Sequence, residues 1–256
     1  MAKRMLLFDL DGTVLTSDST ISHTTVDIIK RCKSEGYNIG FITARSKSRK
    51  IICLLSALPY DFIAFYNGAV IYAKKQLVES NSLPYQQATS ILQKLCNDYP
   101  DVIIDINQES YLSSSTYNKA CSINSTIRKT CSVNNLPSYD VQRIRLKSES
   151  HRCIPLKKYM TDESIFYHTK YGDAIIVHKK ANKGYAAQKA AEIFNITLDQ
   201  MIAFGDDTND IDMIRIVGTG VAMGNANSSL KKIADYITET NDNNGIETWI
   251  IKHLFK

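Results

Sequence analysis

Short apolar runs and helical repeats alternate at both ends of this 256-residue chain, and this alternation limits the possible fold more than any other feature. In the first third, strand-like runs at 5–10, 38–43 and 62–66 are separated by segments with apolar residues at helical spacing. The last third repeats this order, with strand-like runs at 201–204 and 220–223 between helical segments. Strands separated by helices form parallel sheets with helices on both faces, so we expect an α/β domain.

The middle of the chain has a different pattern. A helical segment is followed by closely spaced strand-like runs at 102–106, 144–146, 164–168 and 173–178, the last two joined by a glycine turn. This order predicts an α+β unit with an antiparallel sheet. Residues 110–140 are rich in Ser, Thr and Asn, and their pattern predicts no defined structure. We therefore expect residues 82–182 to be inserted into an α/β domain made of 1–81 and 183–256.

Composition excludes several classes of protein. The apolar share of 44% is enough to bury a core, which argues against disorder. No apolar run approaches the about 18–20 residues that span a bilayer, and the first residues do not resemble a signal peptide. We therefore expect a cytoplasmic protein without a membrane partner, either a monomer or a weak homo-oligomer.

Charge and cysteine usage are also unremarkable. The net charge of +5 is small for this length, and the basic stretch 45–50 is interpreted as a solvated helix start, so no nucleic-acid partner is expected. The six cysteines include no Cys-x-x-Cys pair, which argues against a zinc site and against a small disulfide scaffold. Reduced thiols are the simplest interpretation.

The most specific local motif is Asp9-x-Asp11-Gly12-Thr13, directly after the first apolar run. Residues two apart point to the same side of a strand, so both carboxylates can project from its carboxyl end, where open α/β sheets bind ligands. Two carboxylates placed together are costly unless a cation neutralises them. An Asp-Gly pair alone would indicate only a turn, whereas the full motif indicates a site.

A second acidic cluster, Asp206, Asp207 and Asp210, follows the apolar run at 201–204. One of these aspartates is expected to cap the next helix. Three aspartates in five positions exceed what a cap requires. Hard oxygen ligands without nearby His or Cys are typical of Mg²⁺ rather than zinc.

Two further residues complete a possible site. Thr43 ends the second strand, where its hydroxyl could either cap a helix or hold a phosphate oxygen together with the following backbone N–H groups. Lys183 opens a helix and could be either a surface lysine or a ligand for an anion. The residues alone leave both choices open.

In this order the motifs resemble those of the haloacid dehalogenase-like (HAD) superfamily of phosphatases, and within it the Cof-type hydrolases. The matching positions are Asp9 and Asp11, Thr43, Lys183, and Asp206 with Asp210; Asn67-Gly68-Ala69 and 221–226 also fit. The segment between Asn67 and Lys183 is far longer than one crossover needs, which is where this group carries its cap. The departure is Ala44, where the family often has Gly.

The resemblance implies a Rossmann-like HAD core with a parallel sheet and an inserted α+β cap of the C2B type. It also implies Mg²⁺-dependent hydrolysis of small phosphorylated metabolites, with sugar phosphates favoured. Asp9 would be the nucleophile that forms an aspartyl-phosphate, and Asp11 the acid and base. Mg²⁺ would be held by Asp9, Asp206, Asp210 and the backbone carbonyl of Asp11.

The same resemblance makes Thr43, Lys183, Asn209 and Arg45 phosphate or substrate ligands. Two alternatives remain open. A phosphotransferase or phosphomutase would pass the phosphoryl group to an alcohol instead of water, and the motifs do not exclude it. A non-catalytic binding protein for phosphorylated metabolites would be favoured by a missing motif residue, and none is missing. The sequence does not indicate which phosphate ester is the substrate.

Overall fold

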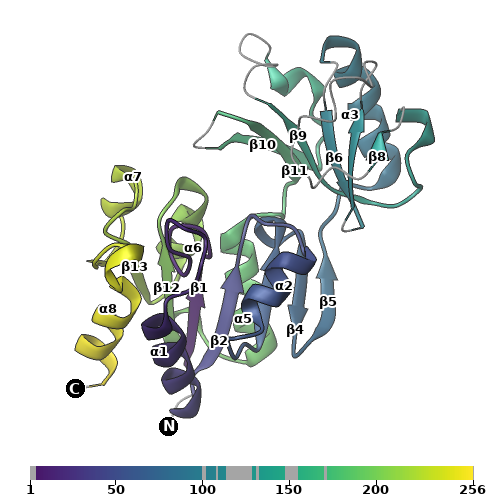
Figure 1. Cartoon of the computed structure of the whole chain (residues 1–256). Coiled ribbons are helices and arrows are strands. Elements are labelled where there is room, and N and C mark those ends of the chain that lie inside the picture. Colours follow the sequence, from purple (N-terminus) through teal and green to yellow (C-terminus); the bar gives the residue numbers. More distant parts are fainter. Residues whose placement is uncertain are drawn as a thin grey trace. The chain divides into compact units, whose positions relative to one another are not determined.

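The computed structural model describes residues 4–99, 102–107, 109–113, 129–130, 133–147, 155–169 and 172–255 (Figure 1). The chain divides into two compact units. One consists of Met1–Ser80 and Asn182–Lys256, and the other of Asn81–Ala181. Within the part left open by the sequence pattern, 110–140, residues 114–128 and 131–132 lie outside the described residues, as does Cys153.

The first unit is built on an eight-stranded sheet with the order β14-β13-β12-β1-β2-β3-β4-β5. The strands from β14 to β3 are parallel, as the strand–helix alternation predicts, and β4 and β5 form an antiparallel edge. The strands are β1 (Met5–Phe8), β2 (Asn38–Ile42), β3 (Phe62–Phe65), β4 (Val70–Ala73), β5 (Gln76–Ser80), β12 (Met201–Gly205), β13 (Thr219–Ala222) and β14 (Tyr236–Ile237).

Helices cover both faces of this sheet, which buries the residues of its central strands on both sides, whereas the edge strands β5 and β14 are largely exposed. On one face, Met5 and Leu7 of β1 pack in a cluster with the alanines of α5. On the other, the rings of Phe8 and Phe204 stack with centroids 5.1 Å apart, and Trp249 of α8 meets Phe204 edge-on. The helices are α1 (His23–Ser34), α2 (Arg49–Leu55), α5 (Lys183–Phe194), α6 (Ile211–Ile216), α7 (Ser228–Lys231) and α8 (Gly245–Leu254).

Side-chain caps fix where the two longest of these helices begin. The Ser22 hydroxyl accepts a hydrogen bond from the backbone N–H of Thr25 and starts α1, and Gly36, with a φ of +88°, follows its end. The Asn182 side chain accepts from the N–H of Tyr185 and starts α5. Lys183 is therefore the first residue of a capped helix.

The second unit carries a six-stranded sheet with the order β10-β11-β9-β6-β7-β8. Its pairs are antiparallel except β7 with β8, which confirms the predicted α+β character. Helix α3 (Tyr85–Asp98) packs through Ala88, Ile91, Leu92 and Leu95 against one face. The strands are β6 (Val102–Ile106), β7 (Glu109–Ser113), β8 (Lys129–Thr130), β9 (Val141–Leu146), β10 (Ser164–His168) and β11 (Ala174–His178).

Short 3₁₀ helices occupy several loops of both units. They are η1 (Tyr66–Gly68), η3 (Val133–Asn135), η4 (Leu156–Tyr159), η5 (Leu198–Gln200), η6 (Thr208–Asp210) and η7 (Asn241–Asn243). Among the described residues, no helix is long and apolar enough to cross a membrane.

Candidate active site

The register of the central strands brings the predicted motifs together. Phe8 of β1 lies opposite Phe41 of β2 on one side and Phe204 of β12 on the other. The residues that follow these positions therefore leave the sheet at the same carboxyl edge. Alternation along β1 places Asp9 on the same side as Met5 and Leu7, which is the side covered by α5.

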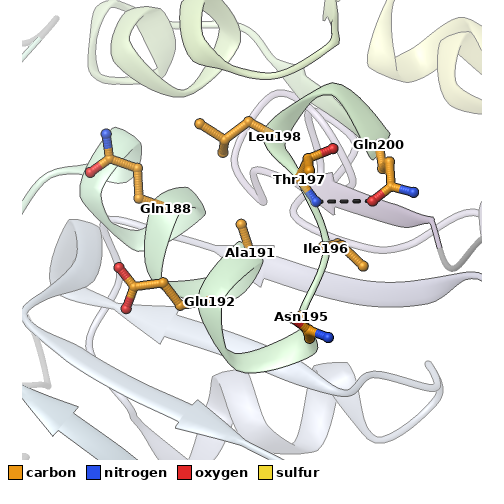
Figure 2. Close-up of a pocket in the computed structure, with 8 residues that line it drawn as sticks. All are labelled: Gln188, Ala191, Glu192, Asn195, Ile196, Thr197, Leu198 and Gln200. Carbon is orange, nitrogen blue, oxygen red and sulfur yellow. Dashed lines mark hydrogen bonds between the residues drawn. The ribbon is translucent and has the colours of Figure 1, made fainter.

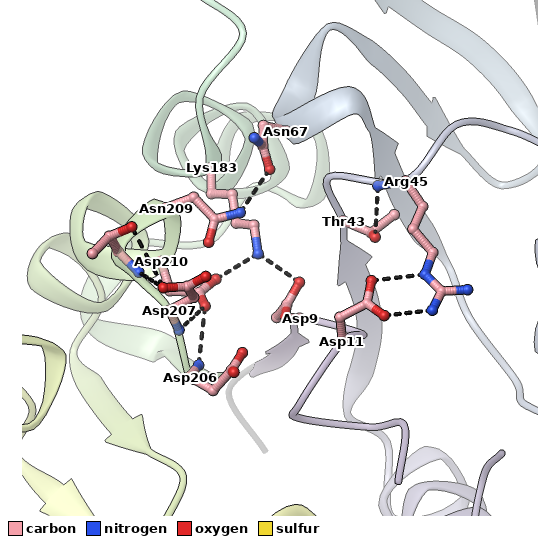
Figure 3. Close-up of polar contacts among 11 residues, drawn as sticks. Asp9, Asp11, Thr43, Arg45, Asn67, Lys183, Asp206, Asp207, Asn209 and Asp210 are labelled. Atoms are coloured by element: carbon pink, nitrogen blue, oxygen red, sulfur yellow. Dashed lines mark hydrogen bonds and ion pairs between the residues drawn. The ribbon is translucent and has the colours of Figure 1, made fainter. Parts of the chain in front are cut away.

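A buried lysine joins two of the predicted aspartates (Figure 3). Lys183 Nζ lies 2.5 Å from Asp9 Oδ1 and 2.6 Å from Asp210 Oδ1, and its side chain is fully buried. Asp9 is 5% exposed and Asp210 is 0% exposed. Helix α5 thus presents its first side chain to the end of β1 and to η6, and Lys183 is not a surface lysine.

The second acidic cluster is organised by hydrogen bonds to the backbone. Asp210 Oδ2 accepts from the backbone N–H groups of Asp206 and Asp207, each at 3.0 Å. Asp207 is the capping residue of η6, because its carboxylate accepts from the N–H of Thr208. The aspartate expected to cap a helix is therefore Asp207. The carboxylates of Asp206 and Asp210 instead lie near Asp9.

Three buried carboxylates converge at this point. Ligand oxygens of Asp9, Asp206 and Asp210 lie within 4.8 Å of one another. A Cβ added to Gly12, which has a φ of +76°, would lie 2.3 Å from Asp206 Oδ2, so the turn after β1 passes directly over this carboxylate. Three carboxylates face one lysine cation, and an all-oxygen set of this kind fits a hard divalent cation such as Mg²⁺. Among the described residues, Asp9, Asp206 and Asp210 therefore form a group that could hold a metal.

The charges of this cluster perturb one another. Burial raises the pKa of Asp9 well above its usual range, and the neighbouring charges of Asp210 and Asp206 act in the same direction against Lys183. Burial alone would lower the pKa of Lys183, but the charges of Asp210 and Asp9 raise it overall. The lysine therefore stays protonated. A bound divalent cation would favour the ionised form of Asp9.

Asp11 lies outside this buried group. Its side chain is 46% exposed, and both carboxylate oxygens accept hydrogen bonds from Arg45, with Nε 2.7 Å from Oδ2 and Nη2 on Oδ1. The contact with Asp11 raises the pKa of Arg45. The guanidinium of Arg45 is thus bound to a predicted catalytic residue.

Thr43 is fully buried at the end of β2. Its hydroxyl oxygen accepts from the backbone N–H of Arg45 at 3.0 Å, which is a local turn contact and not a helix cap. A hydroxyl that accepts one hydrogen bond keeps its own proton for another acceptor. The residue can therefore donate to an anion.

Asn209 contacts the turn that follows β3. Its Nδ2 donates to Asn67 Oδ1 at 3.0 Å, and the N–H of Asn67 donates to the carbonyl of Thr43. Tyr66, Asn67 and Gly68 all have positive φ, of 53°, 57° and 106°, a conformation that costs energy for the first two. This strained turn links the loops of β2 and β12.

Two asparagines near the end of the chain also hold the site loops. Asn225 Nδ2 donates to the carbonyl of Gly12 at 2.8 Å, and the backbone N–H of Asn227 donates to the carbonyl of Asp206 at 2.9 Å. Sequence reasoning singled out Asn225 only through the family resemblance and missed Asn227. A single sequence does not distinguish an asparagine exposed on the surface from one whose hydrogen bonds connect two loops.

A hollow elsewhere on this unit is unrelated to the acidic cluster (Figure 2). It has a volume of about 470 Å³ and is lined by residues that include Gln188, Glu192 and Gln200, at the far end of α5 from Lys183. The 12 residues of α5 span roughly 18 Å. The hollow therefore lies away from the cluster of carboxylates.

Known proteins resemble this chain over nearly its whole length. A family model for haloacid dehalogenase-like hydrolases matches residues 6–250. The 5-amino-6-(5-phospho-D-ribitylamino)uracil phosphatase YitU of Bacillus subtilis is 24% identical, over 98% of this chain and 97% of YitU. The pyridoxal phosphate phosphatase YbhA of Escherichia coli is 26% identical, over 99% of this chain and 100% of YbhA.

Solved structures share the fold. A haloacid dehalogenase-like hydrolase from Bacteroides thetaiotaomicron superposes with a TM-score of 0.84 at 24% identity, covering 98% of this chain and 99% of that one. A sugar phosphatase of HAD subclass IIB superposes with a TM-score of 0.83 at 22% identity, covering 99% of both chains. The family model spans nearly the whole chain, and the expected family is confirmed: the chain belongs to the haloacid dehalogenase-like hydrolases and is a phosphatase.

Proposed function

We propose that this phosphatase hydrolyses small phosphorylated metabolites, with sugar phosphates favoured, through an aspartyl-phosphate on Asp9 and with Mg²⁺ as its metal. The observation that carries the proposal is the buried Asp9 carboxylate, held by Lys183 within the cluster of three carboxylates. A carboxylate is a weak nucleophile towards a phosphate dianion unless nearby cations offset the repulsion, and this cluster supplies one cation and a place for a second.

In the first step, an Asp9 oxygen attacks phosphorus and the bond between phosphorus and the leaving oxygen breaks. Asp11 gives its proton to the leaving alcohol. In the second step, water attacks the phosphorus of the aspartyl-phosphate and gives a proton to Asp11. The Asp9–phosphorus bond breaks and orthophosphate leaves, so both residues return to their starting states.

Positive charge and hydrogen-bond donors stabilise the charge that the transferring group carries. Lys183 and Thr43 bind phosphate oxygens in this proposal. Asn209 supports the surrounding loop through its contact with Asn67. Asp9, Asp206, Asp210 and the backbone carbonyl of Asp11 would hold Mg²⁺. When bound, Mg²⁺ neutralises negative charge on the phosphate and on the three carboxylates.

The substrate class rests on the inserted unit and on the relatives. We propose that residues 82–182 form the cap that selects the substrate. The relatives act on a ribityl phosphate, on pyridoxal phosphate and on sugars, by their names. These substrates have in common a phosphate monoester on a small, polar molecule. A sugar phosphate belongs to this class, and we favour it as the substrate.

The test is hydrolysis of a panel of phosphate esters in Mg²⁺, including hexose phosphates, pyridoxal phosphate and flavin mononucleotide, beside the Asp9→Asn variant. We expect at least one sugar phosphate among the best substrates and no turnover by the variant. Borohydride reduction during turnover should convert Asp9 of the wild-type protein to homoserine, which mass spectrometry detects.

Turnover by Asp9→Asn within about tenfold of wild type would contradict the role of Asp9. Transfer of phosphate to added glycerol in preference to water would favour a phosphotransferase.

A further inference from the structure

The ion pair between Arg45 and Asp11 bears on the proton-transfer step. We propose that Arg45 is a positioning residue that orients the Asp11 carboxylate for proton transfer, and that it does not itself bind the transferred phosphate. This inference rests on the proposed function. It starts from the two-point contact, in which Nε and Nη2 of Arg45 each donate to a different oxygen of Asp11. Such a fork fixes the plane of a carboxylate as well as its position.

Arg45 is held firmly enough to serve as a reference point. Its backbone N–H donates to Thr43 Oγ1 at 3.0 Å, and its carbonyl accepts from the N–H of Tyr66 at 3.0 Å. Thr43 is fully buried, and Tyr66 belongs to the strained turn η1. The backbone of Arg45 is thus tied on both sides, and its guanidinium reaches Asp11 from a fixed base.

Asp11 needs such a partner more than Asp9 does. Asp9 is 5% exposed and surrounded by the buried cluster, whereas the side chain of Asp11 is 46% exposed. An exposed aspartate samples several side-chain rotamers. A misplacement of about 1 Å can cost an enzyme as much as 10²-fold in rate. Arg45 removes this freedom by holding both oxygens.

The fork leaves the chemistry of Asp11 available. A carboxylate has about four lone-pair positions, and a bidentate arginine uses two of them along one edge. The others can carry the proton that goes to the leaving alcohol and later returns from water. Phosphate binding through the same Nε–Nη2 edge of Arg45, in contrast, would require the guanidinium to leave Asp11, and only the donors of Nη1 and the second Nη2 proton lie outside the fork. Lys183, which already contacts Asp9, needs no such movement.

The kinetic test is a double-mutant cycle made of Asp11→Asn, Arg45→Met and the double variant. Glucose 6-phosphate and p-nitrophenyl phosphate serve as substrates in Mg²⁺. We expect Arg45→Met to lower kcat for glucose 6-phosphate by about 10²–10³, a loss in the usual range for general acid–base catalysis. The KM for this substrate should change by less than about threefold. The loss should be smaller for p-nitrophenyl phosphate, since nitrophenolate leaves without a proton. Arg45→Lys should stay slow because it keeps the charge but loses the fork.

The decisive comparison is the double variant. If Arg45 acts through Asp11, Arg45→Met has no further effect in the Asp11→Asn background. Multiplicative losses, or a KM raised tenfold or more with kcat unchanged, would assign Arg45 to phosphate binding and overturn the inference. Absence of any turnover by the wild-type protein would instead overturn the proposed function and this inference with it.

A measurement on the metal-free protein tests the contact without turnover. The ¹⁵N–¹H signal of Arg45 Nε should be protected from exchange with water. It should shift and lose that protection in Asp11→Asn. Asp18→Asn, at an exposed residue away from these contacts, is the matched control and should leave the signal unchanged. An Arg45 signal that is the same in Asp11→Asn and wild type would overturn the inference whatever the kinetics.

Discussion

Asp9 is a buried carboxylate whose charge is only partly balanced, and this affects stability as well as catalysis. Its raised pKa means that the folded protein holds this proton more tightly than the unfolded chain, whose value is near 3.8. The cost of ionising Asp9 is therefore absent well below that pH and grows as the pH rises above it. The buried Asp9 carboxyl group therefore destabilises the metal-free protein at neutral pH relative to the unfolded chain, in which Asp9 ionises freely.

We expect Asp9→Asn to melt higher than wild type in EDTA at pH 7, by about 2–4 °C, because the amide removes this titratable group while Lys183 keeps its contact with Asp210. The difference should shrink as the pH is lowered towards 3.8, where the unfolded wild-type chain also binds the proton. Thermal melts from pH 4 to 8 measure this. A lower melting temperature for the variant at pH 7 would show that the lost contact with Lys183 outweighs the removed charge.

Gly12 allows a second comparison between residues. Gly12 and Gly36 both have positive φ, +76° and +88°, but an added Cβ would collide with Asp206 only at Gly12, whereas nothing lies within 4 Å at Gly36. Gly36→Ala should cost about 1 kcal/mol of stability through backbone strain and keep its activity. Gly12→Ala should destabilise more and lose Mg²⁺ binding, measured by calorimetry. Equal effects of the two substitutions on Mg²⁺ affinity would contradict this account of the turn.

Among the elements, α5 couples local helix chemistry to the site. The Asn182 cap accepts from the N–H of Tyr185 at 2.7 Å, and the next residue is Lys183. We expect Asn182→Ala to cost about 1 kcal/mol and to lower kcat, because the first turn of α5 frays at the lysine. Asn182→Asp keeps a capping oxygen, so it should retain most of the stability and most of the kcat that Asn182→Ala loses. Melting curves and kcat for the pair decide this, and an alanine variant with unchanged melting temperature would refute it.

The strands that sequence patterns found and those they missed differ in their turns. β1, β2 and β12 are apolar runs that end at acidic or hydroxyl residues, so both the strand and its functional end were visible in the sequence. The hairpin of β4 and β5 was not predicted. Its turn is Lys74-Lys75, both with positive φ, where glycine or asparagine is usual, and β5 is largely exposed. Without a usual turn residue between the strands and without a buried face on β5, a single sequence gives no signal for the pairing of β4 with β5.

The site shows a similar division. Aspartates in a strand-end motif were recognisable because their spacing and type are unusual. The pairing of Arg45 with Asp11, and of Asn209 with Asn67, depends on loops from distant parts of the chain. Side chains of Arg and Asn have many possible partners, and only the fold determines which one is within reach.

At the scale of the whole molecule, we expect the metal to affect both activity and stability. EDTA should abolish turnover, and added Mg²⁺ should restore it and raise the melting temperature with concentration, as for any ligand that binds only the folded state. Ca²⁺ should raise the melting temperature yet inhibit, because it accepts more ligands and can hold Asp9 through both oxygens. Asp206→Asn should lose the shift caused by Mg²⁺. Full activity in excess EDTA would rule out the metal.

The two places where the chain passes between its units are chemically unequal. The first follows β5, whose Glu79 accepts a hydrogen bond from the Tyr185 hydroxyl of α5. The second lies between Ala181 and Asn182, directly before the cap of α5 and Lys183. A graft of a relative's inserted unit must therefore end at Ala181, because a junction even one residue later would replace Asn182. Recombination between members of this family is thus restricted at one border by the contact of Glu79 with Tyr185 and at the other by the Asn182 cap that precedes Lys183.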